Sequence, residues 1–197
     1  MNITWTENII VADADYVDQV AFDLTVNFER MLGRRVPQAD MSRWAECVAL
    51  DGGLREGEHL TTVILIHDSQ RDAMRNFTPG RFRDELEGQA FSGPLGEFTF
   101  ATVQTEAMAT KEQLAADIME LLAEQQEVKR IMVALPAATL TQMQQPLQRL
   151  DDDRRLTIFT MQQPQHSRLR HELLGYSIMA ALGISANEID EKLNKTE

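Results

Sequence analysis

The chain has 197 residues, a length that is enough for one buried core. Its residues are 43% hydrophobic and 25% charged, a composition too apolar for a disordered protein. Its 31 Asp and Glu outnumber 19 Lys and Arg, and the net charge of −12 disfavours binding to nucleic acid or to an anionic membrane surface. The single cysteine excludes an internal disulfide framework, and no apolar run approaches the ~20 residues that cross a bilayer. The N-terminal residues lack the pattern of a signal peptide, so we expect a cytoplasmic protein.

The chain opens with a predicted strand and helix. Asn8–Ala12 is a short apolar run rich in β-branched residues, which is typical of a buried strand. Apolar residues then recur at three- and four-residue spacing, which predicts a helix with one buried face that ends at Gly33. Asp15 is the expected N-cap of this helix, with Asp18 in its first turn.

The next segment contains one confident strand and one ambiguous stretch. Asp40–Trp44 favours a short helical turn, whereas Glu46–Leu50 fits a helix or a strand equally well. The glycine-rich residues 51–57 predict a loop, and Leu60–Ile66 predicts a central strand. If residues 47–50 are extended, they form an antiparallel hairpin with that strand.

Residues 69–96 have the least regular pattern of the chain. We expect an irregular insert, either a lid over a site or, as the favoured alternative, a surface connection. Thr78 and Pro79 fit an N-cap followed by the first residue of a short helix that runs to about Glu87. A turn at residues 93–96 then leads into an alternating strand at Glu97–Val103.

The following residues alternate between helices and strands. Thr110 and Gln113 form the pattern of a capping box that opens a helix. Arg130–Leu135 predicts a strand, residues 140–150 predict a short helix, and Leu156–Met161 predicts the last strand.

Two helices are expected at the C-terminus. Ser167 fits the cap of a long apolar helix through Leu182, and Ser185 and Glu188 fit the capping box of a C-terminal helix within residues 185–197. The helix over residues 169–184 is apolar nearly all round, so it is either internal, which is slightly favoured, or half of a homodimer interface.

This alternation predicts the fold class. Helices and strands of these lengths are typical of an α/β protein with a mainly parallel sheet. We expect residues 1–197 to form a single three-layer, Rossmann-like domain with about five or six strands and helices on both faces of the sheet.

Several carboxylates follow predicted strands. Asp13 and Asp15 come after the first strand, Asp68 after the second and Glu106 after the third, and Asp51 is a further candidate. Ligands of open parallel sheets bind beyond the carboxyl ends of the strands. Oxygen ligands suit Mg²⁺ or Mn²⁺, and a metal pair could activate water for phosphoester cleavage. The alternative, one helix cap plus solvated loop acids, is favoured.

Three other features of the sequence are candidate functional sites. The glycines of residues 52–57 match neither a P-loop nor the dinucleotide fingerprint, so no nucleotide cofactor is predicted. Cys47 lies in an apolar run and is expected to be a buried, inert thiol. His67, beside Asp68 at a strand end, is the one histidine with a functional position.

Three resemblances bear on function. The opening residues 9–15 (IIVADAD) resemble the first motif of the PIN and NYN nucleases, which implies a metal site, although residues 135–138 lack their further aspartates. Asp13–Val17 also resembles the first motif of haloacid-dehalogenase-like phosphatases, which implies Asp13 as nucleophile and Asp15 as general acid. With Trp44–Arg55 (WAECVALDGGLR) and Leu174–Gly183 (LGYSIMAALG), the chain resembles an uncharacterised family of bacterial hypothetical proteins without an assigned activity.

The preferred interpretation is a cytoplasmic binding or interaction module without established catalysis. The alternative is a phosphoesterase or nuclease that depends on Mg²⁺ or Mn²⁺, with Asp13, Asp15 and Asp68 as catalytic and metal-binding residues and Asp51 as a further metal ligand. The protein partner considered is a second copy of the chain, in a possible homodimer through the helix over residues 169–184, and neither a membrane nor a nucleic acid is an expected partner.

Overall fold

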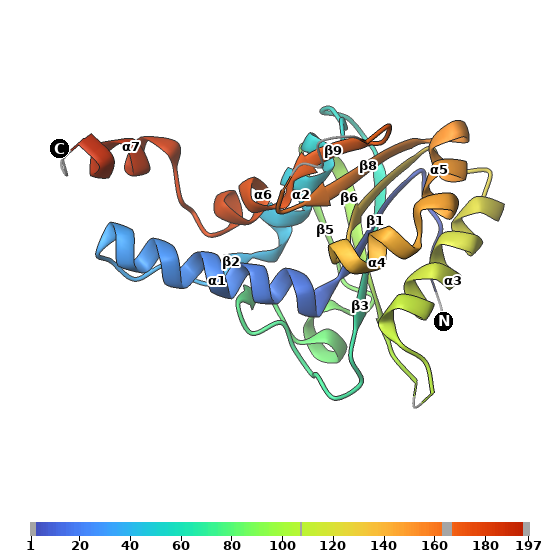
Figure 1. The fold of residues 1–197 in the computed structure, drawn as a ribbon, viewed down its shortest axis with the longest axis horizontal. Helices are drawn as coiled ribbons and strands as arrows, with labels where there is room; N and C mark the ends of the chain where they lie inside the picture. The colour runs from blue at the N-terminus through green and yellow to red at the C-terminus, as the bar shows by residue number, and fades with distance from the viewer. Residues whose placement is uncertain (1–2, 107, 163–166, 195–197) are drawn as a thin grey trace.

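The computed structural model describes residues 3–106, 108–162 and 167–194 (Figure 1). Its strands are β1 (Asn8–Asp13), β2 (Ala39–Asp40), β3 (Leu60–His67), β4 (Phe77–Thr78), β5 (Ala90–Gly93), β6 (Gly96–Gln104), β7 (Arg130–Ala134), β8 (Arg155–Thr160) and β9 (Arg170–Leu173). Its helices are α1 (Ala14–Leu32), α2 (Met41–Asp51), the π-helix η1 (Phe82–Leu86), α3 (Lys111–Glu124), α4 (Ala137–Gln142), α5 (Gln144–Asp153), α6 (Leu174–Ala181) and α7 (Ala186–Asn194).

The main sheet has seven strands in the order β5-β6-β3-β1-β7-β8-β9. All neighbouring pairs are parallel except β5 and β6, which form an antiparallel hairpin. The prediction of an α/β fold with a mainly parallel sheet is therefore confirmed, whereas the expected strand count was too low. The sequence analysis missed the two edge strands, β5 and β9, because each is only four residues long and neither is a continuous apolar run.

The order of the strands reverses beside β1. The chain builds β3 and β6 outward on one side of β1, then returns to place β7, β8 and β9 on its other side. All six residues of β1 are buried, as expected for a central strand. The reversal therefore lies between β1 and β7, and the segments that follow these two strands meet at the same edge of the sheet.

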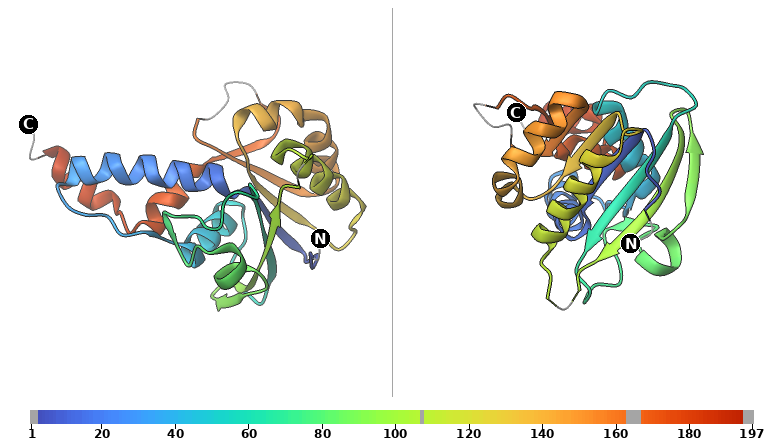
Figure 2. Two further views of the ribbon diagram at one scale, coloured as in Figure 1. Left: turned by 90° about the horizontal axis from the view of Figure 1, so that it is seen from below. Right: turned by 90° about the vertical axis from the view of Figure 1, so that its right-hand side faces the viewer.

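Both faces of the sheet are covered, as Figure 2 shows. Successive side chains of β1 point to opposite faces, so Ile10 and Ala12 belong to one core and Ile9 and Val11 to the other. The first core includes buried residues of α1, α2 and α6, and the second includes buried residues of α3 and α5.

The cap of α1 differs from the prediction. Asp13, the last residue of β1, is the N-cap, and its Oδ1 accepts a hydrogen bond from the Tyr16 amide at 3.0 Å. The helix begins directly after the strand, so Asp15 lies in the first turn and cannot cap it. The predicted end is confirmed, because Gly33 is left-handed with φ 67° and its amide bonds Glu29 O at 2.9 Å.

The ambiguous stretch before the glycine loop is helical. Met41–Asp51 forms one helix, α2, and Asp40 caps it by accepting a hydrogen bond from the Arg43 amide at 3.0 Å. Trp44 and Val48, which are four residues apart, are both fully buried. The antiparallel hairpin considered for residues 47–50 therefore does not form.

The helix predicted from Thr78 begins later than expected. Thr78 belongs to the short strand β4, and only residues 82–86 are helical. The carboxylate of Glu85 accepts hydrogen bonds from the amides of Gly80 and Arg81, at 2.9 and 3.0 Å. These bonds fix a turn before η1, where the sequence pattern placed the first helical residues.

The prediction of one long helix from Ser167 is wrong for the first half of that segment. Arg170–Leu173 instead forms β9, which is parallel to β8, so Leu156–Met161 is not the last strand. Only Leu174–Ala181 within residues 169–184 is helical, and Leu174 and Ile178 on α6 are fully buried. The apolar residues belong to the short core helix, whereas the polar residues before them form an edge strand.

The helix expected within residues 185–197 is present as α7, and residues 195–197 lie outside the described part of the chain. Ser185 Oγ accepts a hydrogen bond from the Glu188 amide at 3.2 Å, which is half of the predicted capping box. The Glu188 carboxylate instead accepts a hydrogen bond from Arg34 Nη2 at 2.7 Å, and this pair joins α7 to the end of α1 (Figure 2).

The internal position of α6 gives a test of the core. We expect Ile178→Ala to lower the free energy of unfolding by about 2–5 kcal/mol, because it leaves a cavity beside the sheet. The matched control, Tyr176→Ala on the same helix, changes a side chain in a residue that is 65% exposed and should cost less than about 1 kcal/mol. Urea denaturation of both variants checks this; equal losses would contradict the internal placement.

Candidate functional site

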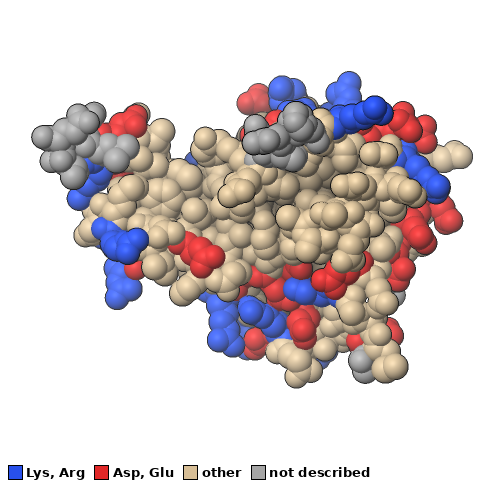
Figure 3. Space-filling model, in the orientation of Figure 1, with Lys and Arg blue, Asp and Glu red and all other residues tan. Residues whose placement is uncertain are grey.

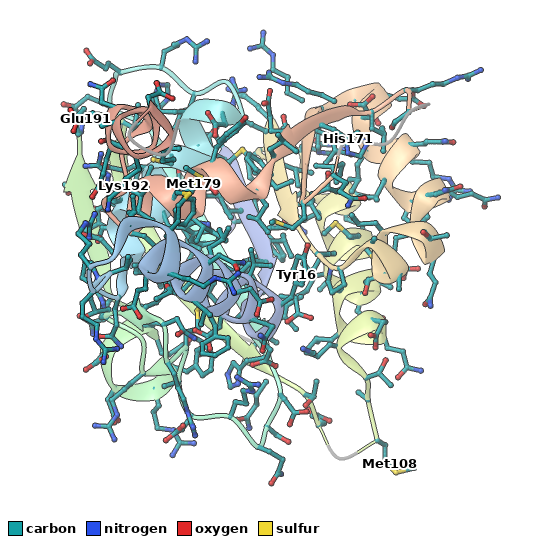
Figure 4. All side chains as sticks on the ribbon, turned by 60° about the vertical axis from the view of Figure 1, so that its left-hand side comes forward. Tyr16, Met108, His171, Met179, Glu191 and Lys192 are labelled. Carbon is teal, nitrogen blue, oxygen red and sulfur yellow. The ribbon has the colours of Figure 1, made fainter. Side chains whose placement is uncertain are left out.

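A cavity of about 460 Å³ lies at the carboxyl end of the sheet, beside the reversal of strand order. Its lining comes from the segments that follow β1, β7 and β8, and from β9. Tyr16 in the first turn of α1, Leu140 on α4, Thr160 at the end of β8 and His171 on β9 mark its sides. Figure 4 shows Tyr16 and His171 coming from these two separate elements. The volume falls within the range of small-molecule pockets.

The described lining of this cavity contains no Lys, Arg, Asp or Glu. Its polar groups are neutral hydroxyls, amides and one imidazole, from Tyr16, Thr141, Gln144, Thr160, Gln162, Ser167 and His171. The surface over α4 in Figure 3 likewise carries few charged side chains. In a chain with 25% charged residues, such a lining favours an uncharged ligand.

Ser167 and His171 form a hydrogen-bonded pair in the cavity. Ser167 Oγ lies 2.9 Å from His171 Nε2, and it accepts a hydrogen bond from the Leu169 amide at 3.1 Å. Burial lowers the pKa of His171, so the ring is neutral near pH 7 and its Nε2 can accept the serine proton. The buried Nδ1 of His171 has no hydrogen-bond partner among the described residues, so no carboxylate orients the ring as in a catalytic triad.

Tyr16 connects the cavity with the acidic residues that follow β1. Its side chain lines the cavity, and its amide donates to the carboxylate of Asp13. Burial, together with the negative charge of Asp13, raises the pKa of the Tyr16 phenol. The hydroxyl is therefore protonated at neutral pH and available as a hydrogen-bond donor to a ligand.

Asp13 and Asp15 converge on a cation that belongs to the chain itself. Lys111 Nζ, at the start of α3, lies 2.9 Å from Asp13 Oδ1 and 3.0 Å from Asp15 Oδ2. The side chains of the two aspartates are only 7% and 10% exposed. Burial lowers the pKa of Lys111, but the hydrogen bonds and charges of both aspartates outweigh it and raise that pKa above its ordinary value.

A second set of contacts joins α1 to the segment after β3. Arg71 Nε lies 3.5 Å from Asp15 Oδ1, and Arg71 Nη1 lies 3.7 Å from Asp18 Oδ2. The buried Asp18 also accepts a hydrogen bond from the Asn76 amide at 2.8 Å. Residues 68–76 are therefore held against α1 by its acidic first turns.

The other predicted acids lie apart from the Asp13–Asp15 pair. The carboxylate of Asp68 accepts a hydrogen bond from the Gln70 amide at 2.8 Å, and only the Asp68 amide reaches Asp15, at 2.9 Å. Asp51 lies at the end of α2, and Glu106 is exposed. No three His, Cys, Asp or Glu side chains within the described ranges form a group that could hold a metal ion. The metal site stays a prediction.

His67 and Cys47 pack against neighbouring parts of the chain and lie outside the cavity described above. The His67 ring stacks on Phe82, with ring centroids 3.8 Å apart, and its Nδ1 lies 3.0 Å from the carbonyl oxygen of Asp68. Cys47 is half-buried and not buried as expected, and burial raises the pKa of its thiol.

The sequence analysis missed Lys111, Arg71 and the Ser167–His171 pair. Thr110 and Gln113 correctly indicated where α3 begins, and the capping box is present. No local signal shows that Lys111, which lies between them, contacts Asp13 and Asp15, 98 and 96 positions earlier in the chain.

Comparison with known proteins shows the family of this chain. Residues 2–189 match the model of a family of unknown function, DUF6621, and the chain belongs to this family. The expected resemblance to an uncharacterised family is thereby confirmed. No curated protein and no solved structure matches the chain. Within the described residues, every helix is too short or too polar to cross a membrane.

Lys111 provides a test of the ion pairs. We expect Lys111→Met to lower the free energy of unfolding at pH 7 by about 2 kcal/mol, because two mostly buried carboxylates lose their shared cation. Adding Asp15→Asn to Lys111→Met should recover part of this loss. The control Lys129→Met alters an exposed lysine and should leave stability nearly unchanged. Denaturation curves that show equal effects for the two lysines would contradict the arrangement.

Titration of Tyr16 provides a test of its environment. We expect its phenol to ionise at a pH above the usual ~10 of a tyrosine, because burial and Asp13 disfavour the phenolate. Since the folded pKa is raised, folding stability from this group is complete below the unfolded pKa of ~10 and falls as pH rises above it. The difference between ultraviolet titrations of the wild type and Tyr16→Phe isolates this phenol; ionisation of Tyr16 at a pH of ~10 or below would count against the prediction.

Proposed function

We propose that this member of the DUF6621 family is a Rossmann-like, three-layer α/β protein that binds an uncharged small molecule at the reversal of strand order. The observation that carries the proposal is the neutral cavity lined by Tyr16, Leu140, Thr160 and His171. This makes the protein a binding module, in agreement with the preferred interpretation of its sequence.

The strand order supports the position of the site. Taken in chain order, the six parallel strands β1, β3, β6, β7, β8 and β9 have the spatial arrangement 3-2-1-4-5-6. That arrangement is typical of Rossmann folds, whose ligands bind at the carboxyl ends of the strands where the order reverses. The cavity beside Tyr16 occupies this position in the sheet.

The residues after β1 disfavour a dinucleotide. In dinucleotide-binding proteins a glycine-rich turn after the first strand lets a pyrophosphate approach the N-terminus of the first helix. Here the same turn is Asp13-Ala14-Asp15, and the Asp13 carboxylate already accepts from the helix N-terminus. A phosphate at this point would meet two carboxylates, so an uncharged ligand with an apolar body fits better.

Hydrogen-bonding groups in the cavity define the class of ligand further. Tyr16 offers a hydroxyl on one side, and Ser167 Oγ, whose hydrogen is donated to His171, offers an acceptor on the other. Leu140, Leu147 and Ile158 supply apolar surface between them. A flat, uncharged heterocycle with polar groups at two ends would satisfy these contacts.

The second candidate function is the metal-dependent phosphoesterase. Asp13 and Asp15 favour it because their oxygens converge on one cationic group, Lys111 Nζ. Mg²⁺ or Mn²⁺ could take that position only if Lys111 moved away, and Asp68 would have to turn its carboxylate from Gln70. The neutral-ligand proposal requires neither change, so we favour it.

The homodimer through residues 169–184 also remains a proposal. Its helical part is α6, whose inner side belongs to the core, and the exposed Tyr176 is the large side chain that a second copy would cover. Multi-angle light scattering of the wild type and Tyr176→Glu distinguishes a dimer from a monomer.

A fragment screen tests the small-molecule site. We expect uncharged heteroaromatic fragments to bind with dissociation constants of about 0.1–1 mM, and matched carboxylates and phosphates to bind more weakly. Leu140→Trp should abolish this binding by filling the cavity, whereas Leu121→Trp alters a leucine on α3 outside it. Ligand-detected NMR measures both. The proposal fails if the same fragments bind the wild type and Leu140→Trp equally.

Melting curves test the metal-dependent alternative. If Lys111 excludes a cation, the wild type should melt at the same temperature in EDTA, Mg²⁺ and Mn²⁺ at fixed ionic strength. Lys111→Met should then gain stability from the metals, because a ligand that binds only the folded state raises its melting temperature. Metal-dependent stabilisation of the wild type itself would instead support the phosphoesterase.

A further inference from the structure

Three arginines lie on adjacent strands at the amino end of the sheet, opposite the neutral cavity. Arg130 begins β7, Arg155 begins β8 and Arg170 begins β9. Arg130 and Arg155 are registered partners, and Arg170 is the partner of Thr157, two residues after Arg155. Registered residues of parallel strands point to the same face, so all three side chains leave the sheet on one face.

The end of α2 approaches these arginines on that face. Arg130 Nη1 donates to Gly52 O at 2.6 Å, and Arg170 Nη2 donates to Asp51 O at 2.7 Å. Arg55, in the loop after α2, donates to Leu54 O at 2.8 Å. Carbonyl oxygens at a helix C-terminus attract cations, which accounts for part of the cluster.

Gly53 provides the space in which two of the guanidinium groups meet. Its φ of 91° is left-handed, and a Cβ at this position would lie 2.9 Å from Arg130 Nη1 and 3.2 Å from Arg170 Nη1. Any larger residue would push these side chains apart. The glycine thus keeps two arginine side chains close together at the surface.

The positive charges of the cluster are poorly matched by carboxylates. Glu172 pairs with Arg170 at 3.0 Å, but among the described residues no carboxylate lies within ion-pair distance of Arg55, Arg130 or Arg155. Burial, then the charges of the other three arginines, lowers the pKa of Arg130, and its buried Nε has no hydrogen-bond partner in the described structure. Glu7 and Asp51 interact with Arg130 and Arg170 beyond ion-pair distance, so the positive charge of the cluster is only partly offset.

We propose that the arginine cluster, Arg55, Arg130, Arg155 and Arg170, binds a compact oxyanion, either free phosphate or the phosphoryl group of a small phosphomonoester. Guanidinium groups match the geometry of phosphate oxygens and bind them with charge-assisted hydrogen bonds. A bound dianion would relieve the repulsion among the arginines. The site is separate from the cavity of the proposed function.

Calorimetry with two probes tests this site and distinguishes the two ligand sources. Sodium phosphate and phenyl phosphate are each titrated into the full chain, with sodium chloride at matched ionic strength as the reference. We expect saturable binding of at least one phosphate and none of chloride. Tighter binding of phenyl phosphate would identify a phosphomonoester, and equal or weaker binding would identify free phosphate.

Single substitutions separate ligand binding from a structural role. Arg155→Gln removes a side chain without hydrogen bonds to the described residues and relieves part of the repulsion within the cluster, so the melting temperature without phosphate should not fall. It should nevertheless weaken phosphate binding about tenfold, as expected for the loss of one charge-assisted contact. Arg149→Gln, at an exposed site on α5, should bind as the wild type does. Absence of phosphate binding in the wild type, or equal binding by wild type and Arg155→Gln, would overturn the proposal.

Discussion

The carboxylate of Asp13 joins three elements of the fold at one point. It ends the central strand β1, caps α1 through the Tyr16 amide and receives the ammonium group of Lys111 from α3. With its side chain only 7% exposed, an unpaired charge here would be strongly destabilising. Lys111 supplies a partner for this charge, so the cap and the ion pair hold β1, α1 and α3 together beside Tyr16.

The parts of the fold that follow local rules could be predicted from the sequence. β1 and β3 are apolar runs, and each was found within one residue of its observed ends. Gly33 was found because only a residue tolerant of the left-handed conformation ends a helix in this way. The alternation of strands with helices likewise predicted the mainly parallel sheet, because helical connections place successive strands in parallel.

The parts that depend on distant contacts could not be predicted. β9 contains Arg170 and Glu172 and becomes a strand only because β8 offers it a hydrogen-bonding partner. Asp13 ends β1 and Asp68 follows β3, as the sequence predicted, whereas Asp51 ends the helix α2. Which acids meet could not be predicted, because Lys111 arrives from α3 and Asp68 turns toward Gln70. Side-chain convergence of this kind is a property of tertiary structure.

The two edges of the main sheet limit how copies of this protein can associate. β5 and β9 each contain four residues, and β9 exposes the charged Arg170 at its start. Short edge strands are poor templates for the addition of a strand from another molecule, and the charge on β9 adds to this, so continuation of the sheet between copies is disfavoured. Open-ended stacking into fibres is disfavoured for the same reason. Any stable assembly of this chain must therefore be formed through helices and side chains, where contact can be limited to a defined number of copies.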